Sequence, residues 1–475
     1  MSKQIKGLWP KFQYKAHQVI GVEWMLAKEK AGTGGLLCDD MGLGKTIQMA
    51  GLLKNGTKSI GEESLLIAPV AVLEQWKVVL KKASLRVFVP SASGVSWQQE
   101  EAGKNNFAPR VYVIGYESAL RKTTLVKAYR WTRVIYDEAH RLGSDNTSTK
   151  LCRLINAKYV WLLTGTPIVN KEKDLLTLLE IAGIEMPSKS LESLSPILKN
   201  YVMARSMDQL RASIPDAPPK PAFKTLTLEF TTEDEREFYT GMTGVISRRW
   251  KALEADGAGN ALEKLKLFMR LRQLSLHPQI YIAARKATLK GLYDRKDWLE
   301  SSTKFDKLKQ LVCESPESHK WIVFCHFRHE MEMLEEMFRT QSQVDLVQQY
   351  HGGLSASQKQ DVLDRTHMPL MEGKQEVLLV QLQSGGTGLN LQHFDQIIFT
   401  GPWWTKALMD QAVGRAVRIG QKNIVTVYNL CLKEETALNI DTYMFQKADE
   451  KGELCKKVLA SANSTITTEE NAASQ

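Results

Sequence analysis

The sequence lacks any run of about 18 consecutive apolar residues, so we expect no membrane-spanning helix. Its first ten residues, MSKQIKGLWP, contain no apolar core of the kind that a secretion signal requires. No tandem repeat is found along the chain either, which argues against a repeat architecture. These absences predict a soluble, intracellular protein that does not act in a membrane.

Cysteine is scarce, and no two of the six cysteines are close enough in sequence for a CxxC zinc motif. His326 follows Cys325, but with no second pair of ligands this does not predict a metal site. We therefore expect reduced thiols that pack as small apolar groups. The cysteines are Cys38, Cys152, Cys313, Cys325, Cys431 and Cys455.

The excess of positive over negative charge is modest in this chain, which has 63 Lys and Arg against 53 Asp and Glu and a net charge of +10. Such an excess favours capture of a polyanion, but many basic proteins never bind nucleic acid. Hydrophobic residues make up 43% of the sequence, enough for a sizeable core. A length of 475 residues suits two or three domains.

Short apolar runs that end near glycine, proline or an acidic residue recur in both halves of the chain. They are long enough for buried strands, and helical stretches such as 46–53 and 72–80 lie between them. This alternation predicts a parallel sheet wrapped by helices in each half. The runs are GGLLCDD, SLLIAPV, RVYVIGY, RVIYDEAH and KYVWLLTG, then WIVFCHF, EVLLVQLQ, DQIIFTG and IVTVYNL.

The region between Pro167 and Trp321 has a different pattern of residues from the two halves. Residues 261–276 have helical spacing and many charges, whereas IPDAPPKPAF is too rich in proline for a helix interior. We expect the proline-rich segment to be the joint between the two halves. The polar residues from Asn463 onward are expected to fray.

A glycine-containing loop, DDMGLGKT, follows the apolar run GGLLC and precedes a predicted helix. A loop in this position points backbone N–H groups at anionic oxygens, as phosphate-binding loops do. Lys45 would then contact the β- and γ-phosphates and Thr46 would bind Mg²⁺. Asp39 stands where the strict pattern has glycine, and the alternative is a glycine-rich turn with a chance GKT.

The sequence DEAH follows the apolar run that ends at Tyr136. An aspartate at a strand end, Asp137, can reach Mg²⁺, and the next carboxylate, Glu138, can orient or deprotonate the attacking water. Taken alone, these four residues are common at the start of a solvated helix. Their position 92 residues after Lys45, in the same half of the chain, is what makes them informative.

Two further segments of the first half are compatible with a nucleotide site. The turn in LLTGTP can sense a phosphate through its hydroxyl groups, although alone it predicts only a turn. The amide of Gln18 can pair with both polar groups of an adenine edge, although a single glutamine is usually a surface residue.

Two segments of the second half carry candidate functional residues. QAVGRAVRIGQ places Arg415 and Arg418 three apart on a predicted helix, where they would share one face and could bind phosphate oxygens. The alternative is a solvated basic helix face. SGGTGLNL begins with Ser384 and Gly385. The Ser384 hydroxyl and the backbone N–H groups of this segment could bind nucleic-acid phosphates. The alternative is a structural turn.

In this order the segments resemble helicase superfamily two, and within it the Swi/Snf-type branch of DNA-dependent ATPases. Ten motifs in register, from residue 17 to residue 421, make the resemblance specific. They are HQVIGVEWM, DDMGLGKTIQ, LLIAPVAVLEQW, VIGYESAL, DEAHRL, LLTGTP, LRQLSLHPQI, YHGGLSASQKQDVLDR, SGGTGLNL and QAVGRAVRIGQ.

The resemblance implies an α/β fold of two RecA-like parallel-sheet lobes with helical insertions. It places ATP-binding lobe one, with a helical insertion near its end, at 1–214 and a linker with the helical insertion of lobe two at 215–300. The helicase C-terminal lobe would occupy 301–460 and a flexible tail 461–475. With no room for chromatin-reading domains, the chain is expected to be a bare motor.

The resemblance also assigns roles to matching residues, with ATP and Mg²⁺ as cofactors. Catalysis would rest on Lys45, Asp137, Glu138, Arg415 and Arg418, with Mg²⁺ on Thr46 and Asp137. Segments that contain Pro69, Tyr116, Ser384 and Gly385 would track the DNA backbone. The nucleotide-binding residues would be Gln18, Asp39, Met41, Gly42, Leu43, Gly44, Lys45, Thr46 and Gln411.

Some positions depart from the usual pattern of the branch and leave the subfamily open. Asp40 replaces Glu, Val417 replaces His, Cys325-His326 replaces Ser-Gln, and Trp404-Thr405 replaces Asn-Pro.

The function implied by the resemblance is a DNA-dependent ATPase that moves along duplex DNA without regard to base sequence. It would act in the nucleus of a eukaryote, or in the cytoplasm if the protein is bacterial, phage or viral. The sequence names no protein partner. A strand-separating helicase on DNA or RNA and a DNA-binding scaffold that does not hydrolyse ATP are the alternatives.

Overall fold

The computed structural model describes most of the chain and divides it into two compact units. The first comprises residues 1–217 and 450–475, and the second comprises residues 218–449. The residues described are 5–57, 62–100, 108–143, 146–186, 194–255, 261–385, 389–433 and 439–463, without the side chains of Ala356, Ser384, Gly385 and 461–463. Each unit is described by itself.

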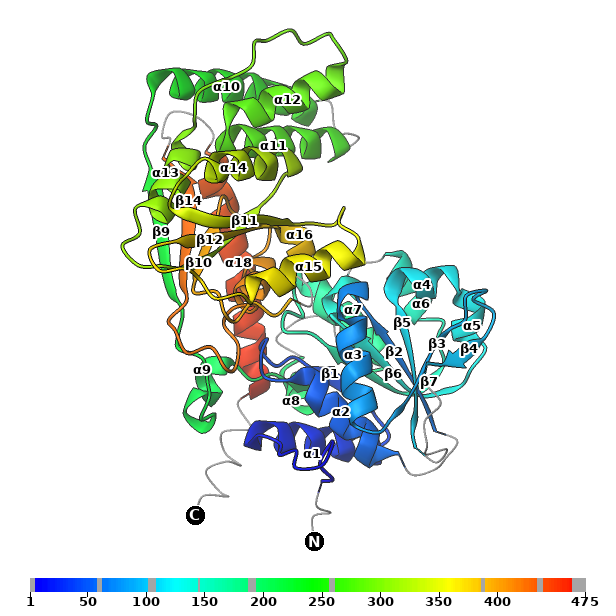
Figure 1. The fold of residues 1–475 in the computed structure, drawn as a ribbon. Helices are drawn as coiled ribbons and strands as arrows, with labels where there is room; N and C mark the ends of the chain where they lie inside the picture. Colours follow the sequence, from blue (N-terminus) through cyan, green and yellow to red (C-terminus); the bar gives the residue numbers. More distant parts are fainter. Residues whose placement is uncertain are drawn as a thin grey trace. The chain divides into compact units, whose positions relative to one another are not determined.

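The first unit alternates strands and helices, as its apolar runs predict (Figure 1). Its strands are β1 (Gly35–Leu37), β2 (Glu63–Ala68), β3 (Arg86–Pro90), β4 (Trp97–Gln99), β5 (Arg110–Gly115), β6 (Trp131–Asp137), β7 (Ala157–Leu163) and β8 (Val202–Met203). Its helices are α1 (Ala16–Lys30), α2 (Lys45–Gly56), α3 (Val70–Lys82), α4 (Tyr116–Arg121), α5 (Thr123–Lys127), α6 (Thr147–Cys152), α7 (Glu172–Ile181), α8 (Ser195–Tyr201) and α9 (Met207–Leu210).

The eight strands of the first unit form one sheet in the order β4-β3-β5-β2-β6-β7-β1-β8. All neighbours are parallel except β3 and β4, which are antiparallel. Two apolar clusters cover its two faces, one with α1, α2 and α3 and the other with α6, α7 and α8. Burial on both faces explains why these strands are continuous apolar runs rather than alternating ones.

The second unit contains a six-stranded sheet in the order β11-β12-β10-β13-β14-β9, parallel throughout. Its strands are β9 (Ala222–Leu228), β10 (Lys320–Cys325), β11 (Val344–Tyr350), β12 (Gln375–Gln381), β13 (Gln396–Phe399) and β14 (Thr426–Leu432). Its helices are α10 (Glu233–Ala255), α11 (Ala261–Leu276), α12 (Pro278–Leu289), α13 (Thr303–Cys313), α14 (Arg328–Arg339), α15 (Ala356–Thr366), α16 (Leu382–Gly385) and α17 (Lys406–Val413), followed by the start of α18 (Ile440–Asn463).

Helices α10, α11 and α12 follow β9 in sequence and precede the other strands of the second sheet. They pack together as a helical insertion (Figure 1). They enclose their own apolar cluster, which includes Phe238, Leu271 and Tyr281. The helix expected over residues 261–276 is α11, with the same bounds. The two mainly parallel sheets and this insertion confirm the predicted α/β fold of two RecA-like lobes.

The proline-rich segment IPDAPPKPAF contains the boundary between the units, which falls between Ala217 and Pro218. Two features were not expected from the sequence. Strand β9, within the stretch expected to be linker and helices, pairs in parallel with β14 along its whole length. Residues from Glu450 onward, in α18, cluster with the first unit rather than with the second.

All six cysteines are free thiols, and all except Cys313 are buried, as expected. None of the helices in the described part of the chain combines the length and apolarity that crossing a membrane requires.

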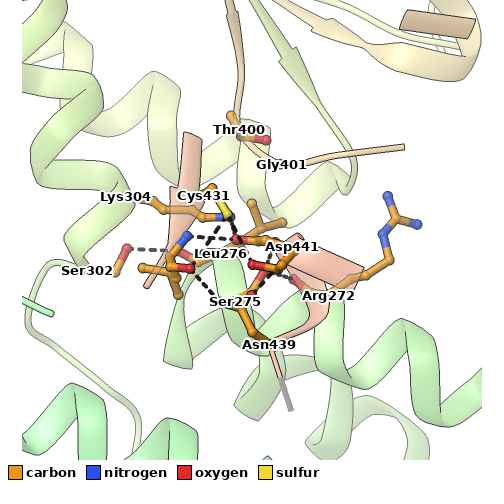
Figure 2. A network of polar contacts seen from close by, with 12 residues as sticks. Arg272, Ser275, Leu276, Ser302, Lys304, Thr400, Gly401, Cys431, Asn439 and Asp441 are labelled. Carbon is orange, nitrogen blue, oxygen red and sulfur yellow. Dashed lines mark hydrogen bonds and ion pairs between the residues drawn. The ribbon is translucent and has the colours of Figure 1, made fainter. Parts of the chain in front are cut away.

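A buried ion pair joins several elements of the second unit (Figure 2). Lys304 Nζ of α13 lies 2.6 Å from Asp441 Oδ2 of α18, and both side chains are at most 3% exposed. Asp441 also accepts hydrogen bonds from Ser275 Oγ of α11 at 3.1 Å and from Leu432 N of β14 at 3.0 Å. One carboxylate therefore ties the start of α18 to the sheet, the insertion and α13.

Replacing Lys304 with Met should destabilise the second unit by about 3–5 kcal/mol, because it leaves the buried Asp441 carboxylate without its cation. The measurement is the midpoint of urea unfolding, followed by tryptophan fluorescence. Lys433→Met is the matched control, since Lys433 pairs with Glu229 at the exposed surface, where pairs contribute at most about 1 kcal/mol. Equal shifts for the two variants would contradict this account.

Candidate nucleotide site

The phosphate loop links the end of β1 to the start of α2, as the sequence predicts. Gly42 and Gly44 have φ angles of +90° and +80°, a conformation that only glycine adopts at low cost. A side chain at Gly44 would also meet Gln18 Nε2 at 2.6 Å. The loop thus brings backbone N–H groups to the N-terminus of a 12-residue helix, where an anion is favoured.

Lys45, the first residue of α2, folds its side chain back over the loop. Its Nζ donates to the carbonyl of Asp39 at 2.6 Å and to that of Asp40 at 3.3 Å. The ammonium group therefore lies beside the loop carbonyls, next to the helix N-terminus. Thr46 follows as the second residue of α2, half-buried, which places its hydroxyl at the same end of the helix.

Arg205 holds the phosphate loop in place through the side chain of Asp39. The sequence did not indicate this residue. The side chain of Asp39 is fully buried and accepts two hydrogen bonds from Arg205, at 3.0 and 2.6 Å. Arg205 also donates to Gln48 Oε1 of α2 and to the carbonyl of His17 in α1. Asp39 therefore offers the site its carbonyl, while its carboxylate anchors the loop.

Gln18 lies against the phosphate loop, although it is 26 residues upstream of Gly44. Its Nε2 donates to the carbonyl of Leu43 at 3.4 Å, and its Oε1 accepts from the backbone N–H of Lys15. The neighbouring His17 contacts the same Leu43 carbonyl through Nε2 at 2.9 Å. The fold thus brings Gln18 to the predicted nucleotide site.

Asp137 ends β6, and its carboxylate is held by two donors. Trp76 Nε1 of α3 donates to Oδ2 at 2.7 Å, and the N–H of Glu138 donates to Oδ1 at 3.0 Å. Burial and then the nearby charge of Glu138 raise the pKa of Asp137 above its usual range. A bound cation would favour the ionised form that Mg²⁺ binding needs.

Glu138 and His140 connect the DEAH segment to the Thr-Gly-Thr turn. Glu138 has a φ of +50°, unusual for a residue other than glycine, and so turns away from the strand direction. His140 Nδ1 is hydrogen-bonded to Thr164 Oγ1 at 3.2 Å and lies 3.4 Å from a Glu138 oxygen. Burial lowers the pKa of His140 to about 4, so the ring is neutral near pH 7.

The three motifs meet because their strands are neighbours. Strands β6, β7 and β1 are adjacent and parallel, so Asp137, the turn at Thr164 and the phosphate loop all lie at the same edge of the sheet. A side chain at Gly165 would lie 3.8 Å from Lys45 Nζ and from Met41 N. The carboxyl edge of a parallel sheet is where α/β proteins bind ligands.

Two residues expected to contact DNA are buried. Tyr116 is 4% exposed, and its hydroxyl donates to the carbonyl of Asp137 at 2.9 Å. Pro69 is buried at the junction of β2 and α3. That the segments containing these residues track the DNA backbone stays a prediction, while the Tyr116 hydroxyl helps to position Asp137.

The predicted helix over QAVGRAVRIGQ ends earlier than expected. Helix α17 stops at Val413, with Gly414 as its C-cap, and tight turns follow. Arg415 is buried, whereas Arg418 is half-buried and donates from Nε to the carbonyl of Gly414 at 3.1 Å. The prediction that the two arginines share one helix face is therefore wrong.

Three other second-unit residues were predicted from the sequence as site residues. Gln411 is buried within α17. The backbone of Ser384 and Gly385 lies in α16, but their side chains fall outside what the structure describes.

Comparison with known proteins identifies the family of the chain. Residues 17–190 match the family model of the SNF2-related domain, and residues 303–420 match that of the helicase conserved C-terminal domain. The chain belongs to the Swi/Snf-type family of helicase superfamily two. It is therefore a helicase-like ATP hydrolase, and the first unit carries the SNF2-related domain of this family.

Several relatives resemble the Swi/Snf-type chain over nearly all of its length. A probable global transactivator of Orgyia pseudotsugata multicapsid polyhedrosis virus is 26% identical, covering 93% of this chain and 90% of the relative. The ISWI chromatin-remodeling complex ATPase CHR11 of Arabidopsis thaliana is 24% identical over 87% of this chain, but the chain spans only 40% of that relative. The SWI2/SNF2 ATPase core of Sulfolobus solfataricus, solved in complex with dsDNA, is 24% identical, covers 98% of both chains and has a TM-score of 0.41.

Replacing Trp76 with Phe removes a hydrogen bond to Asp137 but keeps an aromatic ring in the core. We expect the variant to need about 10–100-fold more Mg²⁺ for ATP hydrolysis, or to be slower by that factor, as is typical for partners of metal-binding carboxylates. The measurement is ATP turnover during a Mg²⁺ titration. Trp131→Phe is the control, because Trp131 Nε1 donates to Val126 at the opposite end of β6. A Trp76→Phe variant that behaves like the control would rule out this role.

Proposed function

We propose that the protein is a DNA-dependent ATPase that translocates on duplex DNA and remodels DNA or protein–DNA complexes without extensive strand separation. The observation that carries the proposal is the meeting of phosphate loop, DEAH segment and Thr-Gly-Thr turn at one sheet edge of an SNF2-related domain. The names of its relatives, which include a chromatin-remodeling ATPase and a chromodomain-helicase-DNA-binding protein of Caenorhabditis elegans, support DNA as the partner.

The residues of the first unit fit ATP and Mg²⁺. The N–H groups around Gly42 and Gly44 suit the phosphates, with Lys45 as their cation. The Thr46 hydroxyl and the Asp137 carboxylate are oxygen ligands of the type that Mg²⁺ prefers. When bound, ATP–Mg²⁺ would supply the phosphoryl group to be transferred and the metal charge that favours the transfer.

The remaining residues take the roles that positioning and proton transfer require. Glu138 would orient the attacking water and accept its proton, because its strained backbone turns it from the strand toward His140. Neutral His140, bonded to Thr164, would link this carboxylate to the turn beside Lys45. Gln18 would contact the adenine, and Arg418, with Gln411 and Arg415, would respond to the phosphates as the arginine motif of the second lobe.

DNA recognition without base preference follows from the proposed movement. A protein that advances along DNA must bind every register equally, so it should contact phosphates rather than bases. Two other functions make different predictions. A strand-separating helicase would part the duplex, and a DNA-binding scaffold would show no ATP turnover.

Lys45→Ala should lower ATP turnover by at least about 10²-fold, because it removes the cation beside the phosphate loop. Affinity for duplex DNA, measured by fluorescence anisotropy, should stay close to that of the wild type. Lys82→Ala, which removes an exposed lysine at the end of α3, is the control for the loss of one positive charge. Turnover near the wild-type rate in Lys45→Ala would remove the phosphate-loop assignment.

Duplex DNA should stimulate ATP turnover more than single strands, with strand separation weak or absent. Separating strands must offset about 1.4 kcal/mol of stacking per base-pair step, whereas tracking one strand of an intact duplex need not. Displacement of a triplex-forming third strand measures translocation, and release of an annealed oligonucleotide measures unwinding. Efficient ATP-dependent separation of the duplex would establish the helicase alternative, and absence of turnover with any DNA would establish the scaffold.

A further inference from the structure

The positive charge of this protein is concentrated in one part of the helical insertion. Residues 245–296 contain 12 Lys and Arg but only 4 Asp and Glu, a net charge of +8 within a chain whose total is +10. This stretch runs from the second half of α10 through α11 and α12 to the segment that follows them. The rest of the chain is almost neutral and the first half of α10 is acidic on balance, so attraction of a polyanion is focused on this stretch.

Most of these cations pair with no acidic side chain that the structure describes. Three of the twelve form ion pairs, which are Lys264 with Glu254, Lys266 with Glu263 and Lys286 with Asp297. Among the described residues, no acidic side chain pairs with the other nine. Those nine are Arg248, Arg249, Lys251, Arg270, Arg272, Arg285, Lys290, Arg295 and Lys296.

Arg270 and Arg285 are the members of this set that lie together between α11 and α12. Arg270 donates to Gln273 Oε1 at 2.9 Å and across to Thr288 Oγ1 of α12 at 2.7 Å, which shows that the two helices run side by side. Burial, and then the charge of nearby Arg285, lower the pKa of Arg270. Two half-buried like charges without a carboxylate oppose each other, and an anion between them would relieve the repulsion.

Two polar atoms, one in this arginine pair and one next to it, are buried without a hydrogen-bond partner in the described part of the chain. They are Nε of Arg285 and the hydroxyl of Tyr293. The guanidinium of Arg285 lies over the Tyr293 ring, 5.5 Å from its centroid, so both atoms belong to one cluster. Buried polar groups in proteins are normally paired, and an oxygen-rich ligand would supply the missing acceptor.

From this geometry we propose that Arg270, Arg285 and Tyr293 form an anion site that binds a phosphate of the duplex DNA backbone. Arginine suits this ligand because its planar guanidinium matches phosphate oxygens. A polymer of phosphates is favoured over one small anion because unpaired cations continue along the insertion, with Lys290, Arg295 and Lys296 following α12 directly. The inference rests on the proposed DNA-dependent function and adds a contact outside the motifs that define the family.

The test is the salt dependence of duplex binding by the full chain, with Arg270→Gln/Arg285→Gln as the variant. Losing one or two phosphate contacts should reduce the slope of log affinity against log salt by about 0.9 per contact. The duplex concentration for half-maximal ATPase stimulation should rise, whereas turnover without DNA and at saturating DNA should not change. Tyr293→Phe should weaken binding in the same direction while removing only the unpaired hydroxyl.

The matched control is Arg153→Gln/Arg339→Gln, which removes the same net charge from two exposed arginines outside the insertion. Equal loss of affinity in the control would overturn the site, because it would show a general effect of charge. Unfolding midpoints for all variants identify any that lose binding by misfolding. Arg270→Lys/Arg285→Lys should bind between the wild type and the glutamine variant if guanidinium geometry contributes.

Two further arms distinguish other ligands of the same site. If inorganic phosphate raises the unfolding temperature of the wild type but not of the glutamine variant, while both bind duplex equally, the site takes free phosphate and the DNA proposal is wrong. Loss of polyglutamate binding with unchanged duplex binding would instead assign it to an acidic protein. Wild-type protein that neither binds duplex nor is stimulated by it would refute the proposed function itself, whereas a stimulated wild type with unaffected variants refutes only this inference.

Discussion

Asp39 and Arg205 form an ion pair that is almost completely removed from water and lies directly under the phosphate loop. The two residues are 166 positions apart, and Arg205 also reaches α1 through His17 and α2 through Gln48. Burying two charges costs solvation free energy that their attraction offsets only with good geometry and additional hydrogen bonds, and this pair has both. We infer that its main effect is to fix one conformation of the loop rather than to add net stability.

Several other groups of the nucleotide site are positioned relative to that loop. Lys45 bonds to the carbonyl of Asp39, and the Thr-Gly-Thr turn passes close to Lys45 at Gly165. From the turn, Thr164 bonds to His140, which in turn lies beside Glu138. The result is a series of neighbouring groups from Lys45, the cation that would hold the phosphates, to Glu138, the carboxylate that would act on water. Catalysis by fixed charges requires such groups to be in place before the reaction begins.

The sequence predicts those parts of the molecule that depend on local pattern. Buried strands, the loop before α2 and the proline-rich joint near Pro218 are all set by residues close together in the chain, and the structure has them where they were expected. Interactions across long separations were missed. A buried Asp39 requires a cation, but nothing local says which of 63 Lys and Arg supplies it.

The errors in the second unit have the same origin. A run such as QAVGRAVR has good helical spacing, but Gly414 ends α17 and the chain turns there. The burial of the Tyr116 ring and its hydrogen bond to the carbonyl of Asp137, 21 residues away, likewise depend on contacts that no local pattern indicates. Strand β9 lies at the edge of its sheet and none of its residues is buried, so it lacks the continuous apolar run that identifies its neighbours.

The partners of buried cations differ between the interior of each unit and the helical insertion. Deeply buried cations such as Arg133, Arg205 and Lys304 each have a carboxylate within 2.7 Å, because an unpaired charge in the interior would be strongly destabilising. Buried Arg272 lacks a carboxylate but lies 4.6 Å from the centroid of the Trp403 ring and donates to neutral His326. Within the described part of the chain, half-buried Arg270 and Arg285 have neither a carboxylate nor a full set of acceptors. Folding alone gives no reason to leave two such charges together, whereas binding of an anion does.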